Sequence, residues 1–557
     1  MQIPRSRIGP AAVIGALLLI PLSLSPLTAP AAADDSGEVT VTATEQSRWS
    51  GGFQTEVTIT NGTGAPLKDW AIEFGLPDGA KVHEMWNASL ERDGGGYSAT
   101  PPRWGAAVPA GKSYTFGYTG TLAKGGPAST PVYCTVNGAP CAGSGSGEEY
   151  RQVGYFTQWG VADRGYTVKD LADTGNAGRL THLNYAFANT GENGECFVSD
   201  EDGKGDAASD YGRAYSASES VDGRADKADQ PLRGTFNQLR KLKRANPGMK
   251  VSIAIGGWEW SDYLSNAALP ENRERSVKSC IDLYLRGNLP EMNGAGGPGS
   301  AAGVFDGIDL DWEWPGTEGE PGNVIRPEDK ENYTAWVQEF RRQLDALEEE
   351  KGRDYGLTAF VPASEAAIDA GYEVDALVEE FDFLNVQGYD LAGAWNPATG
   401  HQSNLVKPDH PDAPERSLET VVQAYLDRGA EPEDLVLGMP FYGRGWTGVE
   451  PGANGDGLYG AAKGAAPGVH EPGFNDYKVL KERVGKDGFT VHRDDRAGTA
   501  WLYNGTEFWN FDDPKAIGLK AAWAREKGLA GAMSWSLDGD DADGSLYGAI
   551  DRELNGR

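Results

Sequence analysis

Apolar and polar residues alternate in short runs between about residues 37 and 141, as in 55–60 (TEVTIT), and turns rich in Asn, Gly and Pro separate the runs. A period of two is that of a β-strand with one buried face, and many short strands in succession are typical of an antiparallel sandwich. The Gly/Ser-rich segment 142–149 that follows predicts a flexible linker. We therefore expect an all-β sandwich domain at 34–141.

From residue 150 onward, apolar runs typical of buried strands alternate with stretches that have a helical period. Strands that alternate with helices favour a parallel sheet, and eight of them favour an α/β fold of the (β/α)8 TIM-barrel type at 150–557. The eight predicted strands lie at 151–156, 182–187, 250–255, 304–313, 357–361, 383–386, 435–439 and 530–535.

The pattern also places one helix and one insertion. After the fourth strand, apolar residues recur three and four positions apart, as on the buried face of a helix. These residues are Tyr333, Val337, Phe340, Leu344 and Leu347. The connection after the seventh strand, 446–511, is too long for a loop and mixes Gly-rich turns with short helical and strand patterns. It predicts an inserted α+β lobe that walls one side of a cleft.

The stretch 306–315 (DGIDLDWEWP), which contains most of the fourth strand, places carboxylates where a purely structural strand would avoid them. Residues two apart share a face of a strand, so Asp309, Asp311 and Glu313 point one way and the apolar residues between them point the other. Burial and mutual repulsion raise the pKa of at least one of these acids, which keeps a general acid protonated at neutral pH. A solvated acidic edge or a calcium site is the alternative, although calcium ligands usually come from flexible loops.

The N-terminus predicts export. Arg5 and Arg7 precede an apolar stretch at 8–24 and the small residues 31–33 (AAA), a pattern typical of a signal peptide at 1–33. No later stretch reaches the roughly 18 to 20 apolar residues that a membrane-spanning helix needs. The net charge of −32 repels nucleic acid and anionic membranes. We expect a secreted, extracellular protein with a neutral partner and no nucleic-acid or membrane partner.

An even number of cysteines, four, indicates disulfides in an oxidising compartment. Cys134 and Cys141 are close enough in sequence to close one loop, which leaves Cys196 with Cys280. Metal binding is the alternative, but no pair has CxxC spacing and the chain has only six histidines. We predict these two disulfides, no metal and no cofactor.

The acidic strand resembles the signature DxxDxDxE of family 18 glycoside hydrolases, which Asp306, Asp309, Asp311 and Glu313 match in full. Segments from strands three, six, seven and eight are similar to further motifs of that family. They are 250–258 (KVSIAIGGW), 387–390 (QGYD), 440–444 (PFYGR) and 533–535 (MSW). The resemblance covers about residues 150–550, and the predicted insertion places the chain nearest the chitinases with a deep cleft.

This resemblance implies a retaining hydrolase without an enzyme nucleophile, because the 2-acetamido oxygen of the substrate attacks the anomeric carbon. Glu313 would protonate the glycosidic oxygen and later activate water. Asp311 would orient the acetamide group, with Asp309 as its buried partner. Tyr389 would hold the acetamide oxygen, and Asp390 would help to distort the sugar ring.

The resemblance also implies a cleft lined by aromatic residues. Trp535 would form the apolar floor beside the cut, and Trp258 and Trp395 would be stacking platforms on the leaving-group side. Arg444 would hydrogen-bond sugar hydroxyls, whereas Gln387 stands where related chitinases often carry methionine. The predicted substrate contacts are Tyr155, Phe187, Trp258, Gln387, Trp395, Arg444 and Trp535. For each aromatic residue alone, packing inside the barrel is the alternative.

The first domain holds tryptophans with two expected roles. Trp70 lies in the alternating run 70–74 (WAIEF), which predicts a core residue. Trp49, Trp86 and Trp104 lie beside turn-like or polar residues and together predict a surface that stacks on sugar rings, with ordinary core packing as the alternative. Four segments resemble family 2 carbohydrate-binding modules, which implies binding to crystalline cellulose or chitin. They are 49–53, 59–61, 86–88 and 137–141.

Together these features predict a secreted, monomeric chitinase that hydrolyses β-1,4 linkages in chitin and chitooligosaccharides, with cellulose as a further ligand of the first domain. A chitin lectin on the same barrel is one alternative, but such lectins typically lack the acid at the position of Glu313. An endoglycosidase that cuts the chitobiose core of N-glycans is another, and it usually has a more open cleft than the predicted insertion leaves.

Overall fold

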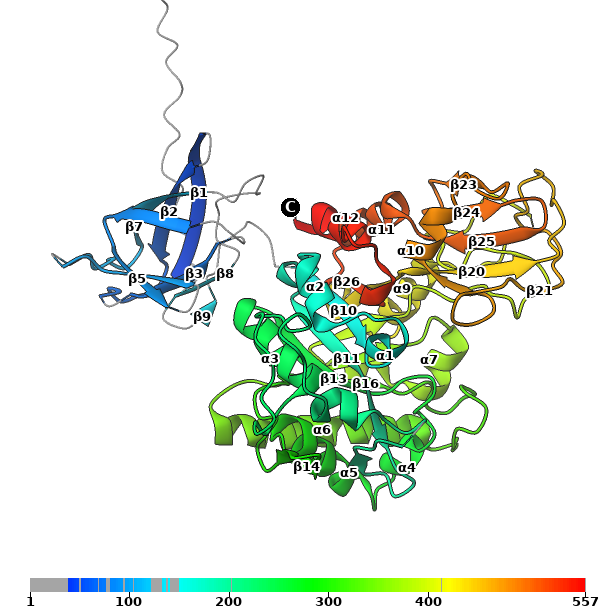
Figure 1. The fold of residues 1–557 in the computed structure, drawn as a ribbon, viewed down its shortest axis with the longest axis horizontal. Helices are drawn as coiled ribbons and strands as arrows, with labels where there is room; N and C mark the ends of the chain where they lie inside the picture. Colours follow the sequence, from blue (N-terminus) through cyan, green and yellow to red (C-terminus); the bar gives the residue numbers. More distant parts are fainter. Residues whose placement is uncertain are drawn as a thin grey trace, which may run out of the picture. The chain divides into compact units, whose positions relative to one another are not determined.

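A computed structural model gives the fold of the chain. It describes residues 39–49, 52–68, 70–76, 81–93, 96–103, 105–121, 133–136, 139–140, 150–201, 203–411 and 413–555. The chain divides into two compact units, Met1–Gly145 and Ser146–Arg557. Figure 1 colours both units along the sequence. The predicted signal peptide, the predicted linker, Trp104 and Cys141 lie outside the described residues.

Two antiparallel sheets form the first unit, as predicted for a sandwich. One sheet has the order β1(Val39–Trp49), β2(Gly52–Asn61), β7(Lys112–Thr121) and β4(Lys81–Trp86). The other has the order β5(Ser89–Asp93), β6(Gly96–Thr100), β3(Ile72–Gly75), β8(Tyr133–Val136) and β9(Ala139–Pro140). Trp70 is 1% exposed and stacks on Phe116, with ring centroids 5.7 Å apart, so it is a core residue as predicted.

Eight parallel strands form a closed barrel in the second unit, which confirms the predicted fold class (Figure 1). Around the barrel, the order is β10(Arg151–Thr157), β26(Gly531–Trp535), β19(Leu435–Pro440), β18(Phe383–Val386), β17(Gly356–Val361), β16(Gly307–Asp311), β13(Lys250–Gly256) and β11(His182–Thr190). The pairing of β10 with β11 closes the ring. The carboxyl ends of all eight strands therefore meet at one face of the barrel.

Helices cover the outside of this barrel because the outward side chains of the strands are apolar. The longer helices are α3(Gly234–Ala245), α5(Arg273–Cys280), α6(Asp329–Lys351), α9(Leu418–Leu426), α11(Pro514–Glu526) and α12(Ser545–Asn555). Shorter helical segments are α1(Gly160–Asp163), α2(Val168–Asp173), η1(Asn176–Gly178), η2(Ala208–Gly212), α4(Leu264–Ala267), η3(Ile281–Leu285), α7(Glu365–Gly371), α8(Val374–Leu377), η4(Pro432–Asp434) and η6(Leu537–Gly539). The predicted buried face of α6 is confirmed, since Tyr333, Val337, Phe340, Leu344 and Leu347 are all buried.

The inserted lobe is a sheet built directly on the end of the seventh strand. Its order is β21(Gly464–Ala465), β20(Tyr442–Thr447), β25(Glu507–Phe511), β24(Thr499–Tyr503) and β23(Thr490–Asp494), and β22(Phe474–Asp476) also pairs with β20. The helical turns α10(Tyr477–Leu480) and η5(Lys481–Arg483) complete the predicted α+β lobe. In chain order the lobe starts with β20, so Tyr442 and Arg444 belong to the lobe and lie next to the carboxyl end of β19.

A disulfide links the connections that follow β11 and β13, the second and third strands of the barrel in chain order. A disulfide joins Cys196, in β12(Cys196–Phe197), to Cys280 at the end of α5, as predicted. The hairpin of β14(Leu289–Met292) and β15(Ala295–Gly297) lies between η3 and β16 in the sequence. None of the helices that the structure describes is both long and apolar enough to cross a membrane.

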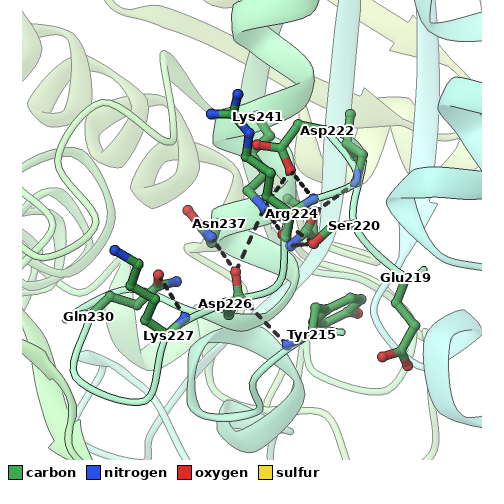
Figure 2. A network of polar contacts seen from close by, with 12 residues as sticks. Tyr215, Glu219, Ser220, Asp222, Arg224, Asp226, Lys227, Gln230, Asn237 and Lys241 are labelled. Atoms are coloured by element: carbon green, nitrogen blue, oxygen red, sulfur yellow. Dashed lines mark hydrogen bonds and ion pairs between the residues drawn. The ribbon is translucent and has the colours of Figure 1, made fainter. Parts of the chain in front are cut away.

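The segment between η2 and α3 is held by polar contacts, shown in Figure 2. The Asp226 carboxylate accepts hydrogen bonds from the Tyr215 backbone N–H at 3.1 Å and from Asn237 Nδ2 at 2.7 Å. Lys241 of α3 pairs with Asp222 at 2.8 Å. These contacts fasten the segment to α3.

Candidate active site

Asp309 lies deepest among the acids of β16 and is completely buried inside the barrel. Tyr155 O–H donates to its Oδ2 at 2.5 Å, and Thr358 Oγ1 donates to its Oδ1 at 2.5 Å. Asn385 Nδ2 also reaches Oδ1, at 3.3 Å. Burial raises the pKa of Asp309 to about 6, and the hydrogen bonds oppose that rise. Side chains from three strands of the barrel, β10, β17 and β18, thus hold this carboxylate in one position.

Asp311 is the second acid on the same face and is 2% exposed. Among the described residues, none donates a hydrogen bond to its Oδ1. Burial, followed by the charges of Glu313 and Asp309, raises the pKa of Asp311 well above its usual value. A buried carboxyl oxygen without a protein partner is costly, so this oxygen is available to a ligand that brings a donor.

Glu313 lies just past the carboxyl end of β16, at the barrel face where active sites of this fold occur. Its backbone N–H donates to Ser261 Oγ at 2.9 Å, and its carbonyl accepts from Asn323 Nδ2 at 3.1 Å. Burial, and then the charge of Asp390, raises the pKa of Glu313 to about 8. The carboxyl is therefore mostly protonated at neutral pH, which is the state that a general acid requires.

Tyr389 and Asp390 follow β18 and face the same acids. The Tyr389 ring is 5% exposed and stacks on Phe360 with centroids 6.1 Å apart. Its hydroxyl lies 4.0 Å from the sulfur of Met533, a weak contact. This hydroxyl is therefore free to donate a stronger hydrogen bond to a ligand.

Asp390 is fixed by the lobe. Arg444 binds its two oxygens in a forked pair, at 2.7 Å from Nε and 2.8 Å from Nη2, and Tyr442 O–H donates to it at 2.8 Å. The guanidinium lies 5.2 Å from the ring centroid of Trp395. The structure thus gives Arg444 a protein partner, Asp390, in addition to the sugar contact expected from the sequence.

An aromatic cluster surrounds Trp535 at the carboxyl end of β26. Its ring lies 5.3 Å from Tyr155 and stacks on Phe187 at 5.7 Å. Trp258 and Trp395 are 46% and 60% exposed, as platforms for a ligand would be. The structure brings these five predicted aromatic residues to the carboxyl-end face of one barrel.

Two residues of this site were missed by sequence reasoning. Trp159 packs against Phe187 at 6.0 Å and against Trp535 at 6.2 Å. Ser261 supports the backbone of Glu313 and itself donates to the Gly257 carbonyl at 2.8 Å. Both follow the ends of predicted strands, and that position is the signal that could have found them.

Gln387 makes a contact inside the protein. Its Oε1 accepts a hydrogen bond from the Ala363 backbone N–H at 3.1 Å, which ties the connection after β17 to the end of β18. The side chain is partly buried. Its predicted contact with the sugar stays a prediction.

The predicted sugar-binding strip of the first unit is described only in part. Trp86 is partly buried, and a Cβ placed on Gly117 would lie 2.2 Å from Trp86 Cζ2. The glycine therefore lets the indole lie directly on β7. The side chain of Trp49 and the whole of Trp104 lie outside the described residues.

Comparisons with known proteins agree with this geometry. Residues 151–540 match Glycosyl hydrolases family 18, and residues 39–141 match the Cellulose binding domain family. The chain is 33% identical to Chitinase C of Streptomyces lividans, over 96% of each protein, and 32% identical to Chitinase 63 of Streptomyces plicatus, over 98% of this chain and 99% of the relative. The solved catalytic domain of psychrophilic chitinase B from Arthrobacter TAD20 is 45% identical, with a TM-score of 0.69, over 73% of this chain and 96% of that one.

Proposed function

The chain belongs to glycosyl hydrolase family 18, and from this premise we propose that it is a chitinase that cleaves β-1,4 linkages between N-acetylglucosamine units. The reaction retains the anomeric configuration and uses the substrate's own acetamido group as nucleophile. Glu313 is its general acid and base. The observation that carries the proposal is the row of acids along β16, in which Glu313 lies just past the strand end, Asp311 Oδ1 has no partner in the residues that the structure describes, and Asp309 is held by Tyr155 and Thr358. The raised pKa of Glu313 agrees with its role as the acid.

The acetamido group is bound by residues whose polar atoms lack strong partners within the described protein. Asp311 Oδ1 accepts the acetamido N–H, which supplies the donor that this buried oxygen otherwise lacks. The Tyr389 hydroxyl, 4.0 Å from a weak sulfur acceptor, donates instead to the acetamido oxygen. These two contacts turn that oxygen toward the anomeric carbon and stabilise the cyclic cation that forms.

Proton transfer starts from Glu313, whose raised pKa leaves it protonated at neutral pH. Glu313 gives its proton to the glycosidic oxygen as the bond to the leaving sugar breaks. Its carboxylate then takes a proton from the water that opens the cyclic intermediate, which restores the acid. Asp309, held by Tyr155 and Thr358, supplies a fixed negative partner that stabilises the proton on Asp311 when no substrate is bound.

Asp390 has a supporting role in this proposal. The forked pair with Arg444 holds Asp390 in one position, where its charge contributes to the raised pKa of Glu313. It also lies beside the ring of the bound sugar. The lobe therefore contributes to catalysis by holding Asp390.

We also propose that the first unit binds insoluble chitin or cellulose, and that the enzyme is secreted and monomeric. The match to cellulose-binding domains supports a polysaccharide ligand, and Trp86 lying over Gly117 supports a flat aromatic surface. Removal of residues 34–141 should leave turnover of soluble oligomers within about twofold and lower activity on solid polymer several-fold. Unchanged adsorption of the truncated enzyme would refute this role.

The catalytic proposal is tested by Glu313→Gln, which keeps the shape of the side chain and removes its proton. We expect kcat on chitin oligomers to fall by about 10³-fold or more, because the leaving oxygen is no longer protonated. Oligomer binding measured by calorimetry should persist. Glu318→Gln, at an exposed acid on the following loop, is the matched control and should be active. Retention of more than a few per cent of activity by Glu313→Gln would contradict the assignment.

A further inference from the structure

Asp210 is a buried carboxylate to which the proposed reaction gives no task. It lies in η2, between β11 and α3, and is 6% exposed. Gln158 Nε2 lies 2.7 Å from both of its oxygens, and Tyr185 O–H donates to Oδ1 at 2.5 Å. Gln158 and Tyr185 are themselves 4% and 0% exposed.

These two partners adjoin the aromatic residues of the cleft. Gln158 directly precedes Trp159, and its backbone N–H donates to the Ala186 carbonyl at 2.7 Å, just before Phe187. Tyr185 is two residues before Phe187 on β11. One carboxylate thus binds the residue just past β10 and a residue of β11, the two segments that carry two of the three stacked rings.

The segment that carries Asp210 is itself held firmly. A Cβ on Gly234, which has φ of +64°, would lie 2.6 Å from the Ser209 carbonyl oxygen and 2.8 Å from that of Asp210, so the amino-terminal end of α3 packs directly on η2. The network around Asp226 fastens the rest of this segment to α3 (Figure 2). Asp210 therefore has a fixed position relative to the barrel.

Burial raises the pKa of Asp210 to about 7, against the hydrogen bonds from Gln158 and Tyr185, which lower it. Removing a carboxylate from water costs free energy, and apolar side chains at this site would stabilise the fold without that cost. The carboxylate supplies a directional constraint that apolar packing does not, because it accepts hydrogen bonds at once from Gln158, just past β10, and from Tyr185 of β11.

We infer that Asp210 is a positioning residue for substrate binding, which aligns Trp159 and Phe187 with Trp535 as one platform for long N-acetylglucosamine chains. The inference rests on the proposed function. It assigns Asp210 to recognition of sugars beyond the cleaved bond and not to the chemical step. Loss of the constraint should therefore weaken the binding of long chains and leave kcat almost unchanged.

The test measures kcat and KM for Asp210→Asn and Gln158→Met on two substrates, a chromogenic N-acetylglucosamine disaccharide and the pentasaccharide. For the pentasaccharide we expect KM to rise about three- to tenfold, with kcat within about twofold, the loss that misaligned stacking predicts. For the disaccharide, KM should rise by less than about twofold, because fewer sugars rest on the platform. Asp229→Asn, at an exposed acid before α3, is the matched control.

A double variant, Gln158→Glu with Asp210→Asn, exchanges the amide and the carboxylate. The new amide can donate to the new carboxylate, so the pentasaccharide KM should return to within about twofold of the native value. An equal loss of kcat on both substrates, an unchanged pentasaccharide KM in the single variants, or failure of the exchange to restore it would overturn the inference. Native enzyme that cleaves neither substrate would instead refute the proposed function.

Discussion

Buried carboxylates of the second unit occupy two different environments. Where the lobe meets the barrel, Asp512 forms an ion pair with Lys520, and both side chains are fully buried. Along the carboxyl end of β16, Asp309, Asp311 and Glu313 form no ion pair with a Lys or Arg in the described part of the chain, and burial is the largest influence on each pKa. The ion pair of Asp512 with Lys520 serves the structure. The three acids along β16, for which the described residues supply no such partner, can bind and release protons.

Asp306 shows the same distinction within the acidic motif. It lies just before β16 and pairs with Lys243 at 2.6 Å and with Arg353 at 3.3 Å, and its Oδ2 accepts the Val251 N–H at 3.0 Å. It therefore joins neighbouring strands at the opposite end of the barrel from Glu313. One short motif holds a structural acid at its start and the proposed catalytic acids at its end.

The largest effect on stability is expected when the buried ion pair of Asp512 with Lys520 is broken. Lys520→Met leaves Asp512 buried without its cation, which should lower the free energy of unfolding by about 3–5 kcal/mol. Thermal unfolding followed by circular dichroism measures the change. The exposed pair of Lys486 with Glu482 provides the control, since Lys486→Met should cost less than about 1 kcal/mol. A stability of Lys520→Met equal to that of the native enzyme would contradict the distinction between the two environments.

The next effect separates the acids of the motif by function. Asp311→Asn removes the negative charge that stabilises the cyclic cation and puts an N–H donor in place of one carboxyl oxygen, so it should lower kcat on soluble oligomers by about 10²-fold. Asp306→Asn loses an ion pair far from the substrate, so it should lower the melting temperature while kcat stays within about threefold. Steady-state kinetics at matched protein stability distinguish the two. Equal losses of kcat would show that the motif acts as one unit.

A smaller effect concerns stability and pH. The pKa of Glu313 rises from 4.5 to about 8 on folding, so burial costs nothing while the group is protonated, and the cost grows as pH rises through this range. Glu313→Gln removes the cost. It should raise the melting temperature by about 2–4 °C at pH 9 and by much less at pH 5. A lower melting temperature of the variant, or a rise that is the same at pH 5 and pH 9, would show that burial of ionised Glu313 does not destabilise the fold.

Much of this architecture follows from local pattern. The alternation of apolar strands with amphipathic helices predicted the barrel, and the two-residue spacing of Asp309, Asp311 and Glu313 predicted an acidic face. The same pattern also predicted the lobe, because a connection as long as 446–511 needs structure of its own.

Other features depend on contacts between distant parts of the chain. Asp210 meets Gln158 across 52 residues, and Asp512 and Lys520 surround Ser403, more than 100 residues away in sequence. No period or motif records such contacts, since each depends on how the closed barrel brings the loops together. The partner that Arg444 finds in Asp390 was missed for the same reason.

The pH dependence of kcat/KM on a soluble oligomer tests the central claim most directly. The native enzyme should lose activity above a pH of about 8, where the buried Glu313 gives up the proton that the leaving sugar needs. Asp390→Asn should move this limb to lower pH, because the charge of Asp390 helps to hold the proton on Glu313. A decline that begins near pH 4.5, the ordinary value of a glutamic acid, would contradict the account.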